Sequence, residues 1–135
     1  MATVTSVVGG LLLVWSAGIH AHLWLSVGYR HIPTIGPLFL LQSVTGVVLG
    51  GLAVVVHRAW SALLGAGFGV ATIGGLIVSV EHGLFGFRDS WSAPFATRSL
   101  VVEAVAVVFL GVAAGLCLVG TGDTGRRAAP SPAIH

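Results

Sequence analysis

The chain contains four apolar stretches, each long enough to cross a lipid bilayer as a helix. They occupy approximately residues 4–27, 37–56, 60–87 and 98–119. A transmembrane helix needs about 20 predominantly apolar residues, because the hydrocarbon core of a bilayer is about 30 Å thick. Only helices and closed barrels satisfy their backbone in lipid, and these stretches lack the alternation of transmembrane β-strands. The sequence therefore predicts an all-α polytopic membrane protein with a four-helix transmembrane bundle.

The composition indicates that lipid is the main solvent for this protein. Charged residues make up 7% of the 135 residues and hydrophobic residues make up 56%, whereas a soluble domain carries about 25% charged residues. The formal net charge is only +2, and no basic stripe of the kind that binds nucleic acid is present. Lysine is absent, which excludes a retinal Schiff base. The single cysteine, Cys117, excludes an internal disulfide.

The polar segments predict the topology. The short connection His57-Arg58 makes the second and third stretches an antiparallel pair. The segment 121–135 is rich in Gly, Pro, Ala and Arg, so we expect a flexible polar tail after one transmembrane domain over residues 1–120. Four spans place both termini on one side of the membrane. The arginines divide evenly between the two sides, and the longer aromatic loops with Asp89 favour cytoplasmic termini.

Ionisable residues interrupt three of the four stretches. From a helical rise of about 1.5 Å per residue, His20 lies roughly 10 Å from the end of its stretch, and Glu81 and His82 lie roughly 8 Å from theirs. Glu103 lies at a similar depth, and so does Gln42 in the remaining stretch. All these ends belong to the membrane face opposite the termini. Ionisable groups in a membrane are expensive and usually mark a functional site, so we predict a polar layer near the outer face.

The residue types in this layer suggest a ligand set. Two imidazoles and two carboxylates suit copper, zinc or iron, so we predict His20, Glu81, His82 and Glu103 as metal ligands. His20 and His82 could instead hold a haem b between them. The Glu-x-x-His spacing of di-iron bundles is absent. Two further roles stay open for these residues: a proton relay or quinone pocket, and hydrogen bonding that only fixes the register of the helices.

Two further features have a packing interpretation. His22 lies about 200° around the helix from His20, so it faces a neighbouring helix or a partner protein. Several glycines in the second and third stretches predict close helix packing, since small residues let membrane helices approach one another. The alternative for the glycines is that they leave room for a flat cofactor.

The leading functional hypothesis is an integral membrane protein whose polar layer binds a metal or haem for redox or metal handling. The alternative is a non-catalytic accessory or assembly subunit of a larger membrane complex. The alternative is favoured by the small size of the chain and by the lack of GxSxG, HExxH and phosphate-binding motifs. A transporter is disfavoured because no internal repeat is detected. Whether the protein is an enzyme is left open.

The segment 28–41, GYRHIPTIGPLFLL, with the preceding residues 22–25, HLWL, resembles small four-span membrane proteins of high-GC Gram-positive bacteria. The resemblance covers the early part of the chain. It implies a bacterial plasma membrane and carries no activity with it. Pro33 and Pro37 each fix φ, and Tyr29 suits the headgroup zone. We therefore expect a rigid loop that covers the polar layer from outside.

Overall fold

The computed structural model describes the backbone of residues 1–127 and the side chains of residues 1–121. Within this part the elements are helices: α1 (Ala2–Ser26), the 3-10 helix η1 (Tyr29–His31), α2 (Ile35–Val56), α3 (Ala59–Glu81) and α4 (Ala96–Arg127). The four α-helices are all long and apolar enough to cross a membrane. The predicted four-helix transmembrane bundle is therefore confirmed.

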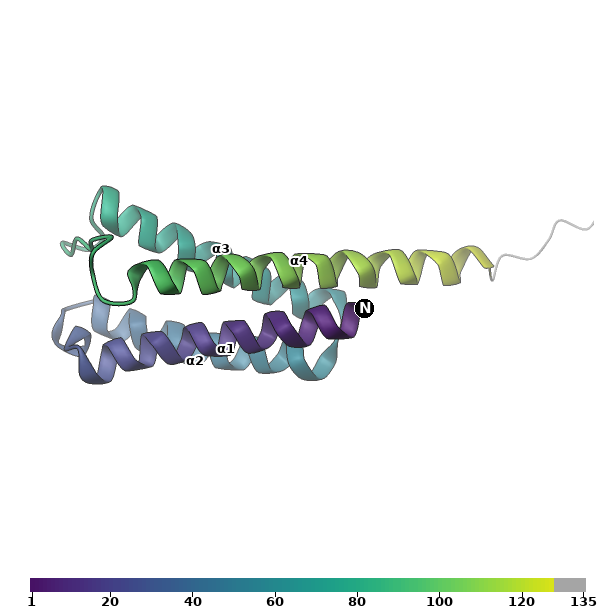
Figure 1. The fold of residues 1–135 in the computed structure, drawn as a ribbon, viewed down its shortest axis with the longest axis horizontal. Coiled ribbons are helices and arrows are strands. Elements are labelled where there is room, and N and C mark those ends of the chain that lie inside the picture. Colours follow the sequence, from purple (N-terminus) through teal and green to yellow (C-terminus); the bar gives the residue numbers. More distant parts are fainter. Residues whose placement is uncertain (128–135) are drawn as a thin grey trace, which may run out of the picture.

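The helices run up and down. The N-terminus lies at one end of the bundle, which we call the terminal end, and the loops 27–34 and 82–95 lie at the other, the loop end (Figure 1). α1 packs mainly against α2 and α4, and α3 packs mainly against α4. α2 and α3 contact each other less, and α3 diverges from α2 toward the loop end (Figure 1). The helix pair joined by the shortest connection is thus the most loosely packed at its far end.

Small residues bring α1 and α2 together near the terminal end. A Cβ on Gly10 would lie 2.6 Å from the carbonyl oxygen of Gly50, and a Cβ on Gly50 would lie 2.6 Å from that of Gly10. The Ser6 hydroxyl donates to the Ala53 carbonyl oxygen at 2.7 Å. In lipid, such close approach stabilises a helix pair through van der Waals contact and interhelical hydrogen bonds. These glycines therefore follow the packing interpretation of the sequence.

A core of small and branched apolar side chains fills the same half of the bundle. Its buried members are Leu13, Ala53, Ala62, Leu110, Ala113 and Ala114. The Leu110 side chain of α4 packs against both α1 and α3. A Cβ added to Gly9 of α1 or to Gly65 of α3 would lie within 2.9 Å of it. A close-packed interior leaves little free volume, and these contacts are of that kind.

α3 ends earlier than the sequence predicts. The third apolar stretch continues to residue 87, but the helix ends at Glu81 and Gly83 adopts a φ of +82°. A left-handed glycine is a common way to end a helix. Arg88 then turns back, and its guanidinium donates to the carbonyl oxygens of Val80 at 3.0 Å and of Glu81 at 2.6 Å. These bonds satisfy carbonyl groups that a helix leaves free at its C-terminus.

The predicted depth of Glu81 and His82 is wrong for this reason. Glu81 is the last residue of α3 and His82 is its C-cap, and both side chains are exposed at the loop end. The apolar sequence continues beyond the helix, but there it forms a tight turn. Leu84 and Phe87 are joined in this turn by backbone hydrogen bonds of 2.6 and 2.9 Å. A hydropathy pattern cannot distinguish such a turn from another turn of helix.

α4 continues beyond the predicted end of the fourth span at residue 119 and reaches Arg127. Once a helix has nucleated, each further residue adds a hydrogen bond at little cost, so a polar extension can remain helical. The predicted tail, 121–135, thus begins as helix. Residues 128–135 lie outside the described residues, and the division at residue 120 stays a prediction.

Candidate functional site

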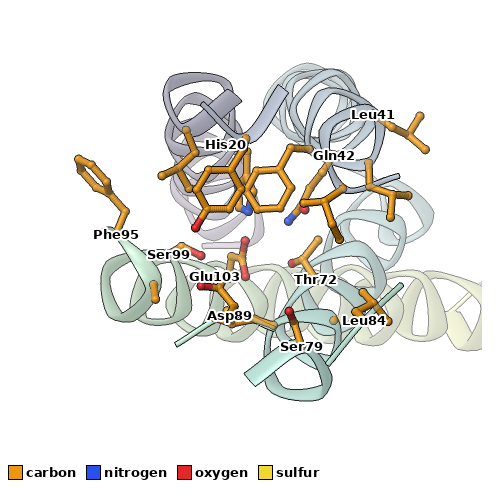
Figure 2. A pocket seen from close by; sticks show the side chains of 18 of the residues that line it. His20, Leu41, Gln42, Thr72, Ser79, Leu84, Asp89, Phe95, Ser99 and Glu103 are labelled. Atoms are coloured by element: carbon orange, nitrogen blue, oxygen red, sulfur yellow. The ribbon is translucent and has the colours of Figure 1, made fainter. Parts of the chain in front are cut away.

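A cavity of about 420 Å³ lies among the four helices toward the loop end (Figure 2). Most of its lining is apolar or aromatic, and polar residues enter it from all four helices and from both loops. These polar residues are His20, Tyr29, Gln42, Thr45, Thr72, Ser79, Asp89, Ser99 and Glu103. A cavity of a few hundred Å³ with a few convergent polar groups is typical of small-molecule sites.

Glu103 of α4 is the most deeply buried ionisable side chain of the cavity, with 1% of its surface exposed. The Ser16 hydroxyl of α1 donates to its Oε1 at 2.7 Å. A buried carboxyl group needs such donors, because burying a polar group without a hydrogen bond is unfavourable. Ser16 therefore holds Glu103 in place across the α1–α4 interface.

His20 lies one helical turn after Ser16 and is also buried. Its Nδ1 lies 2.9 Å from the Ser16 carbonyl oxygen. A carbonyl oxygen can only accept, so Nδ1 carries the proton, and in the neutral ring Nε2 is a hydrogen-bond acceptor. The Phe39 ring packs beside the imidazole, with ring centroids 5.2 Å apart. Ser16 thus orients both His20, through its carbonyl, and Glu103, through its hydroxyl.

Side chains from α2 and α3 complete the polar group. Figure 2 shows Gln42 and Thr72 directed toward the same space as His20 and Glu103. The Thr72 hydroxyl lies 2.9 Å from the Gly69 carbonyl oxygen, to which it donates, and Thr72 also lines the cavity. Gln42 supplies an amide, which both donates and accepts hydrogen bonds. The centre of the cavity therefore offers several acceptors and the amide donors of Gln42.

Aromatic rings cover the cavity at the loop end. Tyr29 packs on Phe39 and Phe87, with ring centroids 4.7 and 5.8 Å apart. Ile32 and Ile35 join this cluster, as expected for a loop that folds over the polar layer. Burial, and to a smaller extent the negative charge of Asp89, raises the pKa of the Tyr29 phenol above its usual value of 10.0. Tyr29 is therefore a neutral hydroxyl at physiological pH.

The structure brings together only part of the predicted layer. His20, Gln42 and Glu103 all line the cavity. Glu81 and His82 do not line it and are exposed at the end of α3. Because α3 ends at Glu81, its side chain and that of His82 leave the bundle interior instead of entering it.

Among the side chains that the structure describes, no group of three or more His, Cys, Asp or Glu residues could hold a metal ion. The four predicted ligands therefore do not form one cluster. His20 and Glu103 are the two that share a cavity. The ligand roles of all four residues stay predictions.

His22 lies outside the cavity. It is exposed on α1, and its ring packs edge-on against Phe95 with centroids 5.4 Å apart. A shallow groove beside this contact runs between α1 and α4 and includes Trp15, Ile19 and Arg98. His22 thus contacts the residue that precedes α4, and a contact with a neighbouring helix or a partner protein stays a prediction.

Several polar residues of the site were not among the predicted ones, and Ser16, Thr72 and Asp89 are three of them. Ser16 precedes His20 by one helical turn, and Thr72 precedes Ser79 by two turns, so helical periodicity contains a signal for both. Asp89 had no such signal, because the sequence placed it beyond the end of a longer third helix. Its location in the cavity follows from the early end of α3.

No protein-family model, no curated protein and no solved structure matches this chain. The cavity and its residues are therefore the basis for any functional conclusion.

Proposed function

We propose that this integral membrane protein binds a small, mostly apolar molecule in the cavity between its four helices. The observation that carries the proposal is that the buried side chains of His20 and Glu103 line a cavity of about 420 Å³. Here Ser16 holds each of them and leaves the His20 Nε2 free to meet a ligand.

The lining defines the kind of molecule. Leucine and phenylalanine side chains from several elements provide an apolar surface, and the polar atoms gather at one place, near Glu103 (Figure 2). A ligand with an apolar body and one hydrogen-bonding end matches this distribution. His20, Gln42 and Glu103 would hold the polar end.

Gly75 provides a direct test. It lines the cavity, and a Cβ built on it meets no atom within 4 Å. We expect Gly75→Phe to fill the cavity without a backbone clash. Small molecules extracted from the purified wild-type protein and identified by mass spectrometry should include one at close to one copy per chain. That compound should be absent from Gly75→Phe.

Gly74→Phe is the matched control. Gly74 also has no atom within 4 Å of an added Cβ, but it faces outward and does not line the cavity. This variant should retain the same compound as the wild type. Equal small-molecule contents in all three preparations would disprove the proposal.

We further propose that the protein lies in a bacterial plasma membrane with both termini on the cytoplasmic side. The resemblance of residues 28–41 supports a bacterial plasma membrane, and the loops at residues 27–34 and 82–95 support cytoplasmic termini. Reporter fusions to the C-terminus that are active on only one side of the membrane would test the orientation.

Binding of copper, zinc, iron or haem b for redox or metal handling is the second proposal for the same layer. Its support is the shared cavity of His20 and Glu103, one imidazole and one carboxyl group. A metal there would need further ligands from a bound molecule, because a stable site takes four or more donors. A metal assay and a visible spectrum of the wild type and of His20→Gln would test this: a metal or haem lost with His20 supports it.

The accessory-subunit alternative has a separate support. The groove between α1 and α4 lies beside the exposed His22 and Trp15, and exposed apolar surfaces can mark partner sites. Purification in mild detergent would test it. Recovery of the chain as a partner-free monomer would count against this role.

A further inference from the structure

The walls of the cavity differ in exposure. The residues that α1 and α4 contribute, among them His20, Ser99 and Glu103, are buried. The α2 and α3 walls include Leu41, which is 61% exposed, and Ala71, which is also exposed. A residue that lines a cavity and is also exposed marks where that cavity reaches the surface. The cavity therefore opens between α2 and α3.

The helix arrangement accounts for this opening. α2 and α3 are joined by His57-Arg58 near the terminal end, and they diverge toward the loop end (Figure 1). α2 packs mainly on α1, whereas α3 packs mainly on α4. Figure 2 shows Leu41 at the rim of the cavity, far from Glu103. α2 and α3 are both long and apolar enough to span a membrane, so a gap between them is placed to face hydrocarbon.

The loop end of the cavity is covered for the most part, and of its lining residues in the two loops only Pro94 is exposed. The packed rings of Tyr29, Phe39 and Phe87 lie over the loop end of the cavity. A molecule dissolved in the bilayer would reach Glu103 between α2 and α3 without disturbing these rings. The site is thus accessible to a compound that resides in the membrane.

The polar atoms restrict the head of such a compound. The His20 Nε2 is an acceptor in the neutral ring, since Nδ1 donates to Ser16. The carboxyl oxygens of Glu103 can accept hydrogen bonds as well. A ring that carries hydroxyl groups can donate to these acceptors and can pack against Phe39, which already contacts His20.

From these observations, and resting on the proposed function, we infer that the ligand is an alkyl-tailed hydroxyaromatic lipid of the quinol type. Its ring occupies the cavity, with a hydroxyl group donating to His20 or Glu103. Its tail leaves between α2 and α3, over Leu41 and Ala71, into the bilayer. Inside the membrane the tail gains little from this path, because lipid tails are as apolar as the helix surface. Recognition therefore lies in the ring, and the opening serves for access.

Calorimetric titrations of the protein in lipid nanodiscs, with empty nanodiscs subtracted, would test this inference. The probes are duroquinol, which has no tail, and decylubiquinol, which has one, both kept reduced. We expect wild-type protein to bind both. Duroquinone, which lacks the hydroxyl protons of duroquinol, should bind roughly fivefold more weakly because it cannot donate to these acceptors.

Ala71→Phe places a ring in the opening. It should weaken decylubiquinol binding about tenfold, a typical effect of overpacking, and leave duroquinol binding unchanged. Gly67→Phe is the matched control: Gly67 lies one turn earlier on α3, is exposed, and has no atom within 4 Å of an added Cβ. It should alter neither titration.

The remaining outcomes separate the inference from the proposed function. If Ala71→Phe weakens both probes equally or neither, the tail does not pass between α2 and α3 and the inference is wrong. If the wild type binds neither probe but retains a compound that Gly75→Phe loses, the ligand class is wrong and the proposed function stands. If no compound is retained either, both fail.

Discussion

The two ends of the bundle are built from the same helices and from similar small and apolar residues, yet one is sealed and the other is hollow. At the terminal end, Gly10 and Gly50 bring two backbones into contact, and alanines of α4 are fully buried. At the loop end, Gly75 faces empty space and Glu103 faces a cavity. Whether small residues seal or open a membrane bundle therefore depends on what lies opposite them.

The direction of the helices accounts for the difference. α1 and α2 stay together along their length, so that serines can also join them: Ser43 donates to the Ala17 carbonyl at 2.8 Å. α3 follows α4 and leaves α2 toward the loops (Figure 1). Diverging helices must be separated by large side chains, by a ligand or by lipid. The phenylalanines and leucines of the loop end fill only part of that space.

The largest effect is expected from filling the sealed end. Gly10→Leu would drive a side chain into the Gly50 backbone, because even an added Cβ would lie 2.6 Å from the Gly50 carbonyl oxygen. We expect a loss of about 3 kcal/mol of stability, or failure to accumulate in the membrane. Gly51→Leu, on a surface with no atom within 4 Å, should have little effect. Thermal unfolding in detergent would measure both, and equal midpoints would contradict a tight contact between the two backbones.

A smaller loss of stability is expected from removing the hydrogen bond between Ser16 and Glu103, which lies between the sealed end and the cavity. Ser16→Ala removes the hydroxyl that donates to the buried Oε1 of Glu103 at 2.7 Å, which should destabilise the fold by about 2 kcal/mol. Binding of the cavity ligand should also weaken, because Glu103 is no longer held in place. Unfolding and ligand retention would be measured on the same preparation.

Ser43→Ala is the comparison for that prediction. It also removes an interhelical serine hydrogen bond, but its acceptor is a helix backbone carbonyl. Loss of such a bond in a membrane protein averages about 0.6 kcal/mol. Ligand retention should not change. A Ser43→Ala variant as unstable as Ser16→Ala would show that the cavity carboxyl group has no special dependence on its donor.

The smallest expected effect is a shift in the pKa of Tyr29, whose ring covers the cavity at the loop end. The chain has one tyrosine, so phenolate absorbance reports Tyr29 alone. Its titration midpoint should lie above the usual 10.0, because burial and then Asp89 raise the pKa. Asp89→Asn should lower the midpoint only partly, since burial is the larger cause. A midpoint at or below the usual value would mean that the ring is not buried over the cavity.

This titration is linked to stability with a definite sign. A pKa raised in the folded state means that the fold favours the neutral phenol. The contribution is present below the unfolded-state pKa of about 10 and is lost as the pH rises through the folded-state value. The loop end should therefore loosen in strong alkali before the sealed end does.

Some of the site could be predicted from the sequence. His20, Gln42 and Glu103 were placed in one layer by counting residues from the ends of the apolar stretches, and they line one cavity. The same counting failed for Glu81 and His82, because an apolar turn at residues 84–87 follows the helix and has the hydropathy of a helix. The left-handed Gly83 and the Arg88 cap, which end α3, leave no clear mark in the hydropathy pattern.

The sequence by itself determined that this chain forms four membrane-crossing helices, since length and apolarity decide that outcome whatever the helices pack against. It also determined that Glu103 and His20 must avoid lipid, because ionisable groups are expensive there. Only the tertiary structure decided that they face a cavity, with Ser16 between them, and that this cavity opens between α2 and α3. That decision depends on helix crossing directions, which arise from contacts between residues far apart in the chain and not from local pattern.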